Sequence, residues 1–326
     1  MSRILICGGG GFVGGHLVKR LIADGHDVLV ADLKLRANWW QWHDESRNHQ
    51  ACDLRNFDHC RHVCRGIDAV FQLAADMGGA GFVFSGDHDA EIMHNSAQIN
   101  LNIAELARLN GFRVFYSSSA CVYPAYNQTD PSNPNCEEST AYPAACDSHY
   151  GWEKLFSEQL YDAYARNHRL EVRIARFHNV MGPQGSWKDG REKAPAAICR
   201  KVAEAKLFGD HHIEIWGDGT QTRSFCWIDD CVQGILDVMN GPYSDPVNLG
   251  SAEMVTINQL VDIAEEIAGV KLKRTYKPDA PTGVAGRNSD NTKFKRQYGW
   301  EPSTPLRTGM VATYAWIEQQ VNQKIK

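Results

Sequence analysis

Short apolar runs alternate with longer stretches of helical spacing along the first half of the chain. The apolar runs occupy residues 69–75, 113–119 and 171–177, and helical spacing fills 88–110 and 148–167 between them. Short runs that are apolar throughout are typical of parallel strands covered by helices on both faces. The pattern therefore predicts an α/β fold built on a doubly wound parallel sheet.

The beginning of the chain shows one complete strand-helix-strand unit. The apolar run RILIC meets four glycines, apolar residues then recur at helical spacing from Phe12 to Ile22, and a second apolar run ends at Asp32. A change from a strand run to helical spacing across glycines is typical of a βαβ unit. The predicted sheet is therefore of the Rossmann type.

The pattern changes after residue 178. Loops rich in Gly, Pro and Lys follow, with helical spacing at 256–269 and again at 306–323. We expect a cofactor-binding domain over residues 1–178 and a smaller mixed α/β lobe over 179–326 that binds substrate. A strand-helix pattern returns within 216–250, so this segment is expected to cross back to the first domain.

The bulk composition excludes some classes of function. The chain has 326 residues, 43% of them hydrophobic, and a net charge of −5. A negative balance gives no general attraction for nucleic acid. Neither a charged leader nor an apolar run of about 18 residues occurs. We expect a globular, cytosolic protein without a nucleic-acid or membrane partner.

Ten cysteines occur. Because we expect a cytosolic protein, we expect these cysteines to be reduced. His59, Cys60, His62 and Cys64 crowd into one short segment, DHCRHVC. A zinc site usually needs a second ligand pair farther along the chain, and these four span less than two helical turns, so they cannot all point one way. We therefore predict a partly exposed helix face and no metal.

Glycines after the first strand predict a dinucleotide site. Gly8, Gly11 and Gly14 follow GxxGxxG spacing, which lets a backbone approach a pyrophosphate at a helix N-terminus. Asp32 ends the second strand, where a carboxylate can accept hydrogen bonds from a ribose diol and repel a 2′-phosphate. The cofactor is therefore predicted to be NAD, with Phe12 and Val13 at the start of the contacting helix.

Other positions near this site carry alternatives. Lys34 and Arg36 follow Asp32 closely and could favour a phosphorylated cofactor, but a solvated loop is the favoured interpretation. Asp53 is a candidate for the adenine end, with an ordinary helix cap as its alternative. Leu73, at the end of the 69–75 strand, completes the predicted cofactor contacts.

A tyrosine and a lysine four residues apart carry candidate chemistry. Tyr150 and Lys154 fall on one face of a predicted helix, where a nearby cation is expected to lower the pKa of the phenol. With the glycine turn and the strand ending SSSACVY, this order resembles the short-chain dehydrogenase/reductase superfamily, in its extended, nucleotide-sugar-modifying branch. The resemblance implies that Ser119 holds the sugar hydroxyl, Tyr150 acts as base and Lys154 binds the nicotinamide ribose.

Longer motifs narrow the resemblance. AADMGGAGF (74–82), SSACVYP (118–124), RFHNVMGPQGSWKDGREKAPAA (176–197), WGDGTQTRSF (216–225) and GRNSDN (286–291) are similar to the GDP-mannose 3,5-epimerase family. This family oxidises C4 of the sugar with NAD and then inverts C3 and C5. The resemblance implies that Cys121 and Lys193 form the acid/base pair for that inversion. A thiolate can remove a proton next to a ketone, and an ammonium can deliver one on the opposite face.

Substrate contacts follow from the same motifs. Gly78 and Gly79 are expected to let the sugar approach the backbone, with loop flexibility as the alternative. Arginine binds phosphate in a bidentate way, so two arginines of the second lobe are the expected diphosphate ligands. The complete set of predicted substrate contacts is Gly78, Gly79, Ser119, Asn179, Glu192, Lys193, Arg223 and Arg287.

Some interpretations remain open at this stage. A nucleotide-sugar epimerase for another base or for a heptose would use the same chemistry, and the loop 33–48 with Trp39, Trp40 and Trp42 departs from the family pattern. A third interpretation is a non-catalytic NAD-binding regulator, and the intact proton donors argue against it.

The two long helical stretches predict a homodimer, because such helices usually pair into a four-helix interface in this superfamily.

Overall fold

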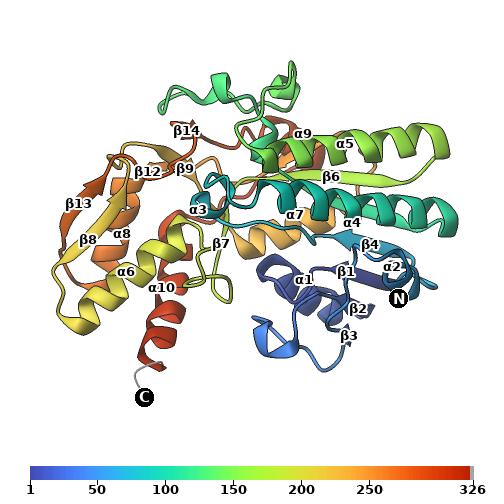
Figure 1. The fold of residues 1–326 in the computed structure, drawn as a ribbon, viewed down its shortest axis with the longest axis horizontal. Helices are drawn as coiled ribbons and strands as arrows, with labels where there is room; N and C mark the ends of the chain where they lie inside the picture. The colour runs from blue at the N-terminus through green and yellow to red at the C-terminus, as the bar shows by residue number, and fades with distance from the viewer. Residues whose placement is uncertain (324–326) are drawn as a thin grey trace.

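The apolar runs of the sequence form one parallel sheet at the centre of the larger lobe (Figure 1). The structure is a computed structural model that describes residues 1–323. Within these residues the sheet has seven strands in the order β11-β6-β5-β4-β1-β2-β3, and every neighbouring pair is parallel. The strands are β1 Arg3–Cys7, β2 Asp27–Ala31, β3 Arg47–His49, β4 Ala69–Gln72, β5 Arg113–Ser119, β6 Val172–Phe177 and β11 Val247–Leu249. The predicted doubly wound sheet of the Rossmann type is confirmed.

Helices cover both faces of this sheet because its side chains alternate between two apolar clusters. Ile4 and Ile6 of β1 belong to one cluster, and Leu5 and Cys7 belong to the other. The first cluster is completed by α1 Phe12–Ala23 and α7 Ile228–Asn240. The second is completed by α2 Phe57–Val63, α4 Asp89–Asn110 and α5 His149–His168. The strand order reverses between β1 and β4, and such a switch point is where ligands bind in this fold.

The smaller lobe has its own apolar core, at the left of Figure 1. Three helices pack there on two paired strands: α6 Ala194–Phe208, α8 Ile257–Ala268, α10 Leu306–Gln323, β8 His212–Trp216 and β13 Lys273–Lys277. Thr256 and Gln259 form a reciprocal capping box at the start of α8. Short elements link the lobes: α3 Ala80–Val83, β7 Val180–Met181, β9 Thr222–Ser224, β10 Cys226–Trp227, β12 Met254–Thr256, β14 Gly286–Arg287 and α9 Thr292–Tyr298.

The chain returns from the smaller lobe to the large sheet. β11 pairs in parallel with the end of β6, and α7 packs against α1. Phe294 of α9 is fully buried in the cluster that also contains α1 and α7. Residues beyond 178 therefore complete the larger lobe, and a division near residue 178 stays a proposal.

The four metal-ligand residue types around α2 point to different sides of the helix. Cys60 and Cys64 are buried in the core, whereas His59 and His62 are exposed. This segment is a partly exposed helix, with the histidines outward and the cysteines inward. Throughout residues 1–323 the cysteines are free thiols. In the same range, none of the helices has the length and apolar content to cross a bilayer. The cytosolic location stays a prediction.

Candidate active site

The segment of residues 8–14, which joins β1 to α1 and includes the first residues of α1, is called the cofactor turn here. Gly8 has a positive φ of 81°, and a Cβ on it would lie 3.0 Å from the backbone of Ala74. A Cβ on Gly14 would lie 2.4 Å from the carbonyl oxygen of Gly8. Gly11 stands at the N-cap of α1, before Phe12 and Val13. Side chains are therefore sterically excluded at Gly8 and Gly14, which lets a phosphate approach the backbone at the N-terminus of α1.

Asp32 lies beside the cofactor turn, at the end of β2. Its side chain accepts hydrogen bonds from the backbone amides of Gly10 at 3.0 Å and of Lys34 at 2.9 Å. A carboxylate oxygen can accept a second bond, so both oxygens retain capacity for a ribose diol. The side chains of Lys34 and Arg36 are exposed, and the guanidinium of Arg36 lies 4.2 Å from the ring of Trp42. The glycine backbone and the buried carboxylate together fit NAD.

The remaining cofactor candidates lie along the same edge of the sheet. The carboxylate of Asp53 accepts hydrogen bonds from Nε and Nη2 of Arg55, and these bonds lower its pKa. The alternative that Asp53 caps a helix is wrong, because Asn56 is the N-cap of α2. Leu73 follows β4, donates its amide to the carbonyl of Cys7 at 3.1 Å and packs on the core.

Tyr150 and Lys154 lie on the buried face of α5, directly beyond the end of β5. Tyr150 is 7% exposed and Lys154 is 2% exposed. The ammonium of Lys154 donates to the carbonyl of Ser117 at 2.9 Å and lies 5.6 Å from the ring centroid of Tyr150. These contacts hold both groups against the end of the strand that carries Ser119.

The charge states of this pair differ from the sequence prediction. Burial, reinforced by Cys121, raises the pKa of Tyr150, and a hydrogen bond with Ser119 opposes the rise only in part. Burial also lowers the pKa of Lys154. The net shift in the pKa of Tyr150 is therefore upward, opposite to the expected direction, because desolvation of the phenol is the largest effect on it.

Cys121 is the middle residue of a 3₁₀ turn, Ala120–Val122, that directly follows β5. Its amide donates to Oγ of Ser119 at 3.2 Å, and its half-buried side chain packs against the cluster that contains Tyr150. Sγ accepts a hydrogen bond from Nη1 of Arg287 at 3.1 Å. The thiol thus borders the phenol on one side and a cation from the second lobe on the other.

Lys193 reaches the same place from the smaller lobe, at the N-cap of α6. The amide of Gly79 donates to the carbonyl of Arg191 at 3.0 Å, and a Cβ on Gly79 would lie 2.2 Å from the carbonyl oxygen of Glu192. Burial lowers the pKa of Lys193, whereas Cys121 opposes that change. A lysine with a lowered pKa gives up its proton more readily, which suits a general acid.

Gly78 and Gly79 allow close packing of the chain, and their predicted contact with the sugar stays a prediction. A Cβ on Gly78 would lie 2.7 Å from Cβ of Phe82, and the space at Gly79 is taken by the backbone of Glu192. The two glycines allow close packing of the 78–79 turn on the segment that carries Lys193. The carboxylate of Glu192 pairs with Arg200 at 3.1 Å and accepts from the amide of Gly190.

In the second lobe, the side chains predicted to contact substrate form hydrogen bonds with other residues of the protein. Asn179 has a positive φ of 42°, and its amide donates to the carbonyl of Ser224 at 3.2 Å. Arg223 donates to the carbonyls of Thr282 at 2.9 Å and Val284 at 2.7 Å, and burial lowers its pKa to about 10. Phosphate ligation by Arg223 stays a prediction.

Arg287 is also held, by an aspartate that the sequence did not single out. Its Nη2 donates to Asp147 at 2.6 Å, and its Nε donates to Oε1 of Gln128 at 2.6 Å. Asp147 precedes Ser148, the N-cap of α5, so its sequence position reads as part of a helix start. The structure brings together six side chains, called the proton-transfer pocket below: Ser119, Cys121, Tyr150, Lys154, Lys193 and Arg287.

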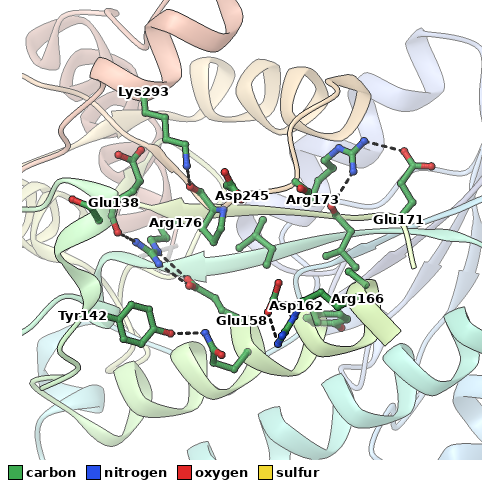
Figure 2. A pocket seen from close by; sticks show the side chains of 18 of the residues that line it. Glu138, Tyr142, Glu158, Asp162, Arg166, Glu171, Arg173, Arg176, Asp245 and Lys293 are labelled. Atoms are coloured by element: carbon green, nitrogen blue, oxygen red, sulfur yellow. Dashed lines mark hydrogen bonds and ion pairs between the residues drawn. The ribbon is translucent and has the colours of Figure 1, made fainter. Parts of the chain in front are cut away.

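A separate cavity of about 1220 Å³ lies between α5, β6 and α9. Figure 2 shows the ion pair of Arg176 and Glu158 in this cavity, with 2.7 Å between Nη2 and Oε2 and 3% of each side chain exposed. Glu158 also accepts a hydrogen bond from Ser118, the neighbour of Ser119. This network connects β6 and α5 to the end of β5, so it stabilises the strand end that carries Ser119.

Comparisons with known proteins agree with this geometry. The chain matches the model of the NAD dependent epimerase/dehydratase family over residues 4–250. It is 43% identical to GDP-mannose 3,5-epimerase 1 of Oryza sativa subsp. japonica and 42% identical to GDP-mannose 3,5-epimerase of Arabidopsis thaliana. Both alignments cover 99% of this chain, and they cover 83% and 84% of these relatives. The resemblance drawn from the motifs is confirmed.

A solved structure supports the same fold. UDP-glucose 4-epimerase of Thermotoga maritima, solved with UDP-glucose, superposes with a TM-score of 0.87 at 25% identity. The superposition covers 98% of this chain and 99% of that chain. The two-lobed arrangement is therefore shared along nearly the whole length of both proteins.

Proposed function

Because the chain belongs to the NAD dependent epimerase/dehydratase family and matches GDP-mannose 3,5-epimerases along almost its full length, we propose that it inverts GDP-mannose at C3 and C5. Inversion at both carbons gives GDP-L-galactose, and inversion at C5 alone gives GDP-L-gulose. One observation carries the proposal: Cys121 and Lys193 add two proton-transfer groups to the Tyr150 and Lys154 pair. An epimerase that acts at C4 alone has no need of that second pair.

The first step is removal of the proton from the C4 hydroxyl. Ser119 holds this hydroxyl, Tyr150 in its phenolate form takes the proton and becomes a phenol, and the positive charge of Lys154 favours that phenolate before the transfer. When bound on the cofactor turn, NAD supplies hydride acceptance and return at C4. The same three residues return the proton when the ketone is reduced again.

The second step inverts the neighbouring carbons. The C4 ketone acidifies the hydrogens on C3 and C5, and the electron pair of the broken C–H bond moves onto the C4 oxygen as an enolate. The thiolate of Cys121 takes the proton and becomes a thiol, and the ammonium of Lys193 delivers one to the opposite face and becomes an amine. Exchange with solvent restores both groups. The lowered pKa of Lys193 supports its role as donor.

Solvent exchange in heavy water tests this proposal. GDP-mannose incubated with the protein and NAD in heavy water should gain deuterium at C3 and C5, as read by NMR of the sugar. Conversion to a C4 epimer without deuterium at C3 or C5 would identify a simpler epimerase. If GDP-mannose is inert but another nucleotide sugar exchanges at the same carbons, the chemistry stands and the substrate assignment falls.

We also propose that the protein is a homodimer that pairs through α4 and α5. The two helices pack side by side, and they expose four large apolar side chains: Leu101 at 40%, Leu109 at 56%, Trp152 at 42% and Phe156 at 46%. Exposed apolar groups on paired helices favour burial against a second copy. Light scattering should give twice the chain mass, and a single 36.5 kDa species would contradict the dimer.

A further inference from the structure

The guanidinium of Arg287 is bound by protein groups in three directions. Nη1 donates to Sγ of Cys121 at 3.1 Å. Nη2 donates to Oδ2 of Asp147 at 2.6 Å, and Nε donates to Oε1 of Gln128 at 2.6 Å. Only 8% of the Arg287 side chain and 5% of the Asp147 side chain are exposed. These contacts hold Arg287 in one orientation, with one nitrogen on the sulfur.

Gln128 makes this orientation rigid. It is fully buried, and its amide nitrogen donates to the carbonyls of Tyr123 at 3.1 Å and Pro124 at 3.2 Å. Its oxygen is thereby aimed at Arg287. Asp147 is held in turn by a hydrogen bond from the hydroxyl of Ser148 at 3.1 Å. The loop that begins the helix of Tyr150 thus also orients the arginine.

Cationic groups lie around the sulfur of Cys121. Burial disfavours the charge of Arg287, but Cys121 and Asp147 outweigh burial and raise the pKa of the guanidinium. The guanidinium is a charged donor 3.1 Å from the sulfur, and charge-assisted hydrogen bonds are stronger than neutral ones. The other titratable groups that interact electrostatically with Cys121 are Cys146, Tyr150, Lys154, Lys193 and Arg223, and three of them are cations.

We propose that Asp147 is a positioning residue that keeps Arg287 hydrogen-bonded to the sulfur of Cys121, so that contact with the guanidinium sets the reactivity of that sulfur. This inference deepens the proposed function and rests on it, since it concerns the group that takes the proton from the sugar. Asp147 acts through Arg287 and does not itself contact the sugar. Neutralising Asp147 weakens the hold on the guanidinium and leaves the thiol in place.

A role for Arg287 as a diphosphate ligand makes a different prediction. The guanidinium would have to leave at least one of its three partners to reach a phosphate. Loss of Asp147 would then change the affinity for the substrate and leave the reactivity of Cys121 in the absence of substrate unchanged. The two uses can therefore be separated with the Asp147→Asn variant, which preserves size and removes the negative charge.

Alkylation of Cys121 without substrate is the direct test. The full-length protein is treated with iodoacetamide across a range of pH, and the label on Cys121 is followed by peptide mass spectrometry. In Asp147→Asn the midpoint of the alkylation profile should rise by about one pH unit, which is about tenfold slower labelling at a fixed pH below the midpoint. Arg287→Gln should raise the midpoint at least as far, and Arg287→Lys, which keeps the charge, should raise it less.

The matched control is Asp262→Asn, which makes the same change in another aspartate-arginine pair of the second lobe. It should leave the alkylation profile of Cys121 unchanged. A wild-type midpoint in Asp147→Asn, with a thermal midpoint showing that the variant is folded, overturns the proposal. If Asp147→Asn does not fold, Arg287→Gln and Arg287→Lys decide by the same readout.

Turnover gives the second readout. With GDP-mannose in heavy water, Asp147→Asn should lose about tenfold in deuterium incorporation while the absorbance of reduced nicotinamide still develops. A raised KM with unchanged kcat and unchanged alkylation would assign Arg287 to the diphosphate and overturn the proposal. If GDP-mannose proves inert even with the wild-type protein, the proposed function fails, and the alkylation profile still decides the role of Asp147.

Discussion

The cofactor turn and the proton-transfer pocket lie near one end of the same sheet, but they are built in different ways. The cofactor turn is one contiguous segment, residues 8–14, whose function depends on absent side chains and on backbone amides. The pocket collects side chains from β5, α5, the start of α6 and β14. Arg287 and Cys121 touch although 166 residues separate them in the chain.

This difference shows how binding and chemistry are divided. Replacing a glycine of the cofactor turn should distort the turn, because the added side chain would clash with neighbouring atoms of the chain. A pocket made of titratable side chains tolerates conservative changes in shape but is sensitive to changes in proton affinity. Mutations in the two regions should therefore fail in different steps of the reaction.

The largest effect is expected from Cys121→Ser. A hydroxyl holds its proton far more tightly than a thiol, so deuterium exchange at C3 and C5 should fall by about 10³-fold. NAD affinity and the affinity for GDP-mannose should stay within about twofold of wild type, because the change removes no binding contact of the cofactor turn. NMR of the sugar and calorimetric titration measure the two quantities.

Cys146→Ser is the matched control for this variant. Cys146 is a half-buried thiol close to Cys121, and its Sγ donates to the carbonyl of Val122 at 3.4 Å. Its exchange rate should remain near wild type. Wild-type exchange in Cys121→Ser would remove the thiol from the reaction.

Lys193→Ala should separate oxidation from inversion. Tyr150 and Lys154 serve C4, so the absorbance of reduced nicotinamide should still develop, whereas product formation should fall by about 10²-fold. Lys188→Ala is the control, since Lys188 lies on the same loop, is exposed and pairs with Glu204. A normal kcat with a raised KM would instead make Lys193 a substrate ligand.

Gly14→Ala tests the other region. The added Cβ would lie 2.4 Å from the carbonyl oxygen of Gly8, so the turn must shift, and NAD should bind about thirtyfold more weakly, equivalent to about 2 kcal/mol. Gly25→Ala is the control, because no atom lies within 4 Å of a Cβ at Gly25 although its φ is 81°. Gly25→Ala should lower stability without changing NAD affinity. Equal NAD binding by both variants would contradict the steric account of the turn.

The smallest expected effect is on stability in acid. Burial lowers the pKa of His178 to about 3 from an ordinary 6.5, so this residue is neutral in the folded chain and takes up a proton on unfolding below pH 6.5. Its contribution to stability is present above pH 6.5 and is lost as pH falls from there toward about 3. By pH 5.5 the loss should be about 1 kcal/mol relative to pH 7.

His178→Gln isolates this contribution, because glutamine cannot titrate in this range. Denaturant unfolding at the two pH values should show a smaller loss of stability in the variant than in the wild type. Equal losses would mean that His178 is already protonated in the folded chain. Since His178 bonds to Asn248 of β11 behind the pocket, this measurement probes the support of the pocket and leaves the cofactor turn unaffected.

Local patterns in the sequence predicted the elements that depend on neighbours along the chain. Strand β5 and helices α4 and α5 lie within a residue of the predicted ranges, because apolar period and helix length are local properties. The glycines of the cofactor turn were identifiable for the same reason. The proposed roles of Cys121 and Lys193 rest on long sequence motifs. Such motifs identify residues with suitable chemistry but give no distances between them.

Tertiary structure decided what those residues touch. Gly79 leaves room for the backbone of Glu192. Burial raises the pKa of Tyr150, opposite to the expected shift. Asp147 reads as part of a helix start in the sequence, yet it orients Arg287 on the sulfur. Desolvation and contacts between distant segments depend on how two lobes pack, and packing is a property of the whole chain that no local pattern specifies.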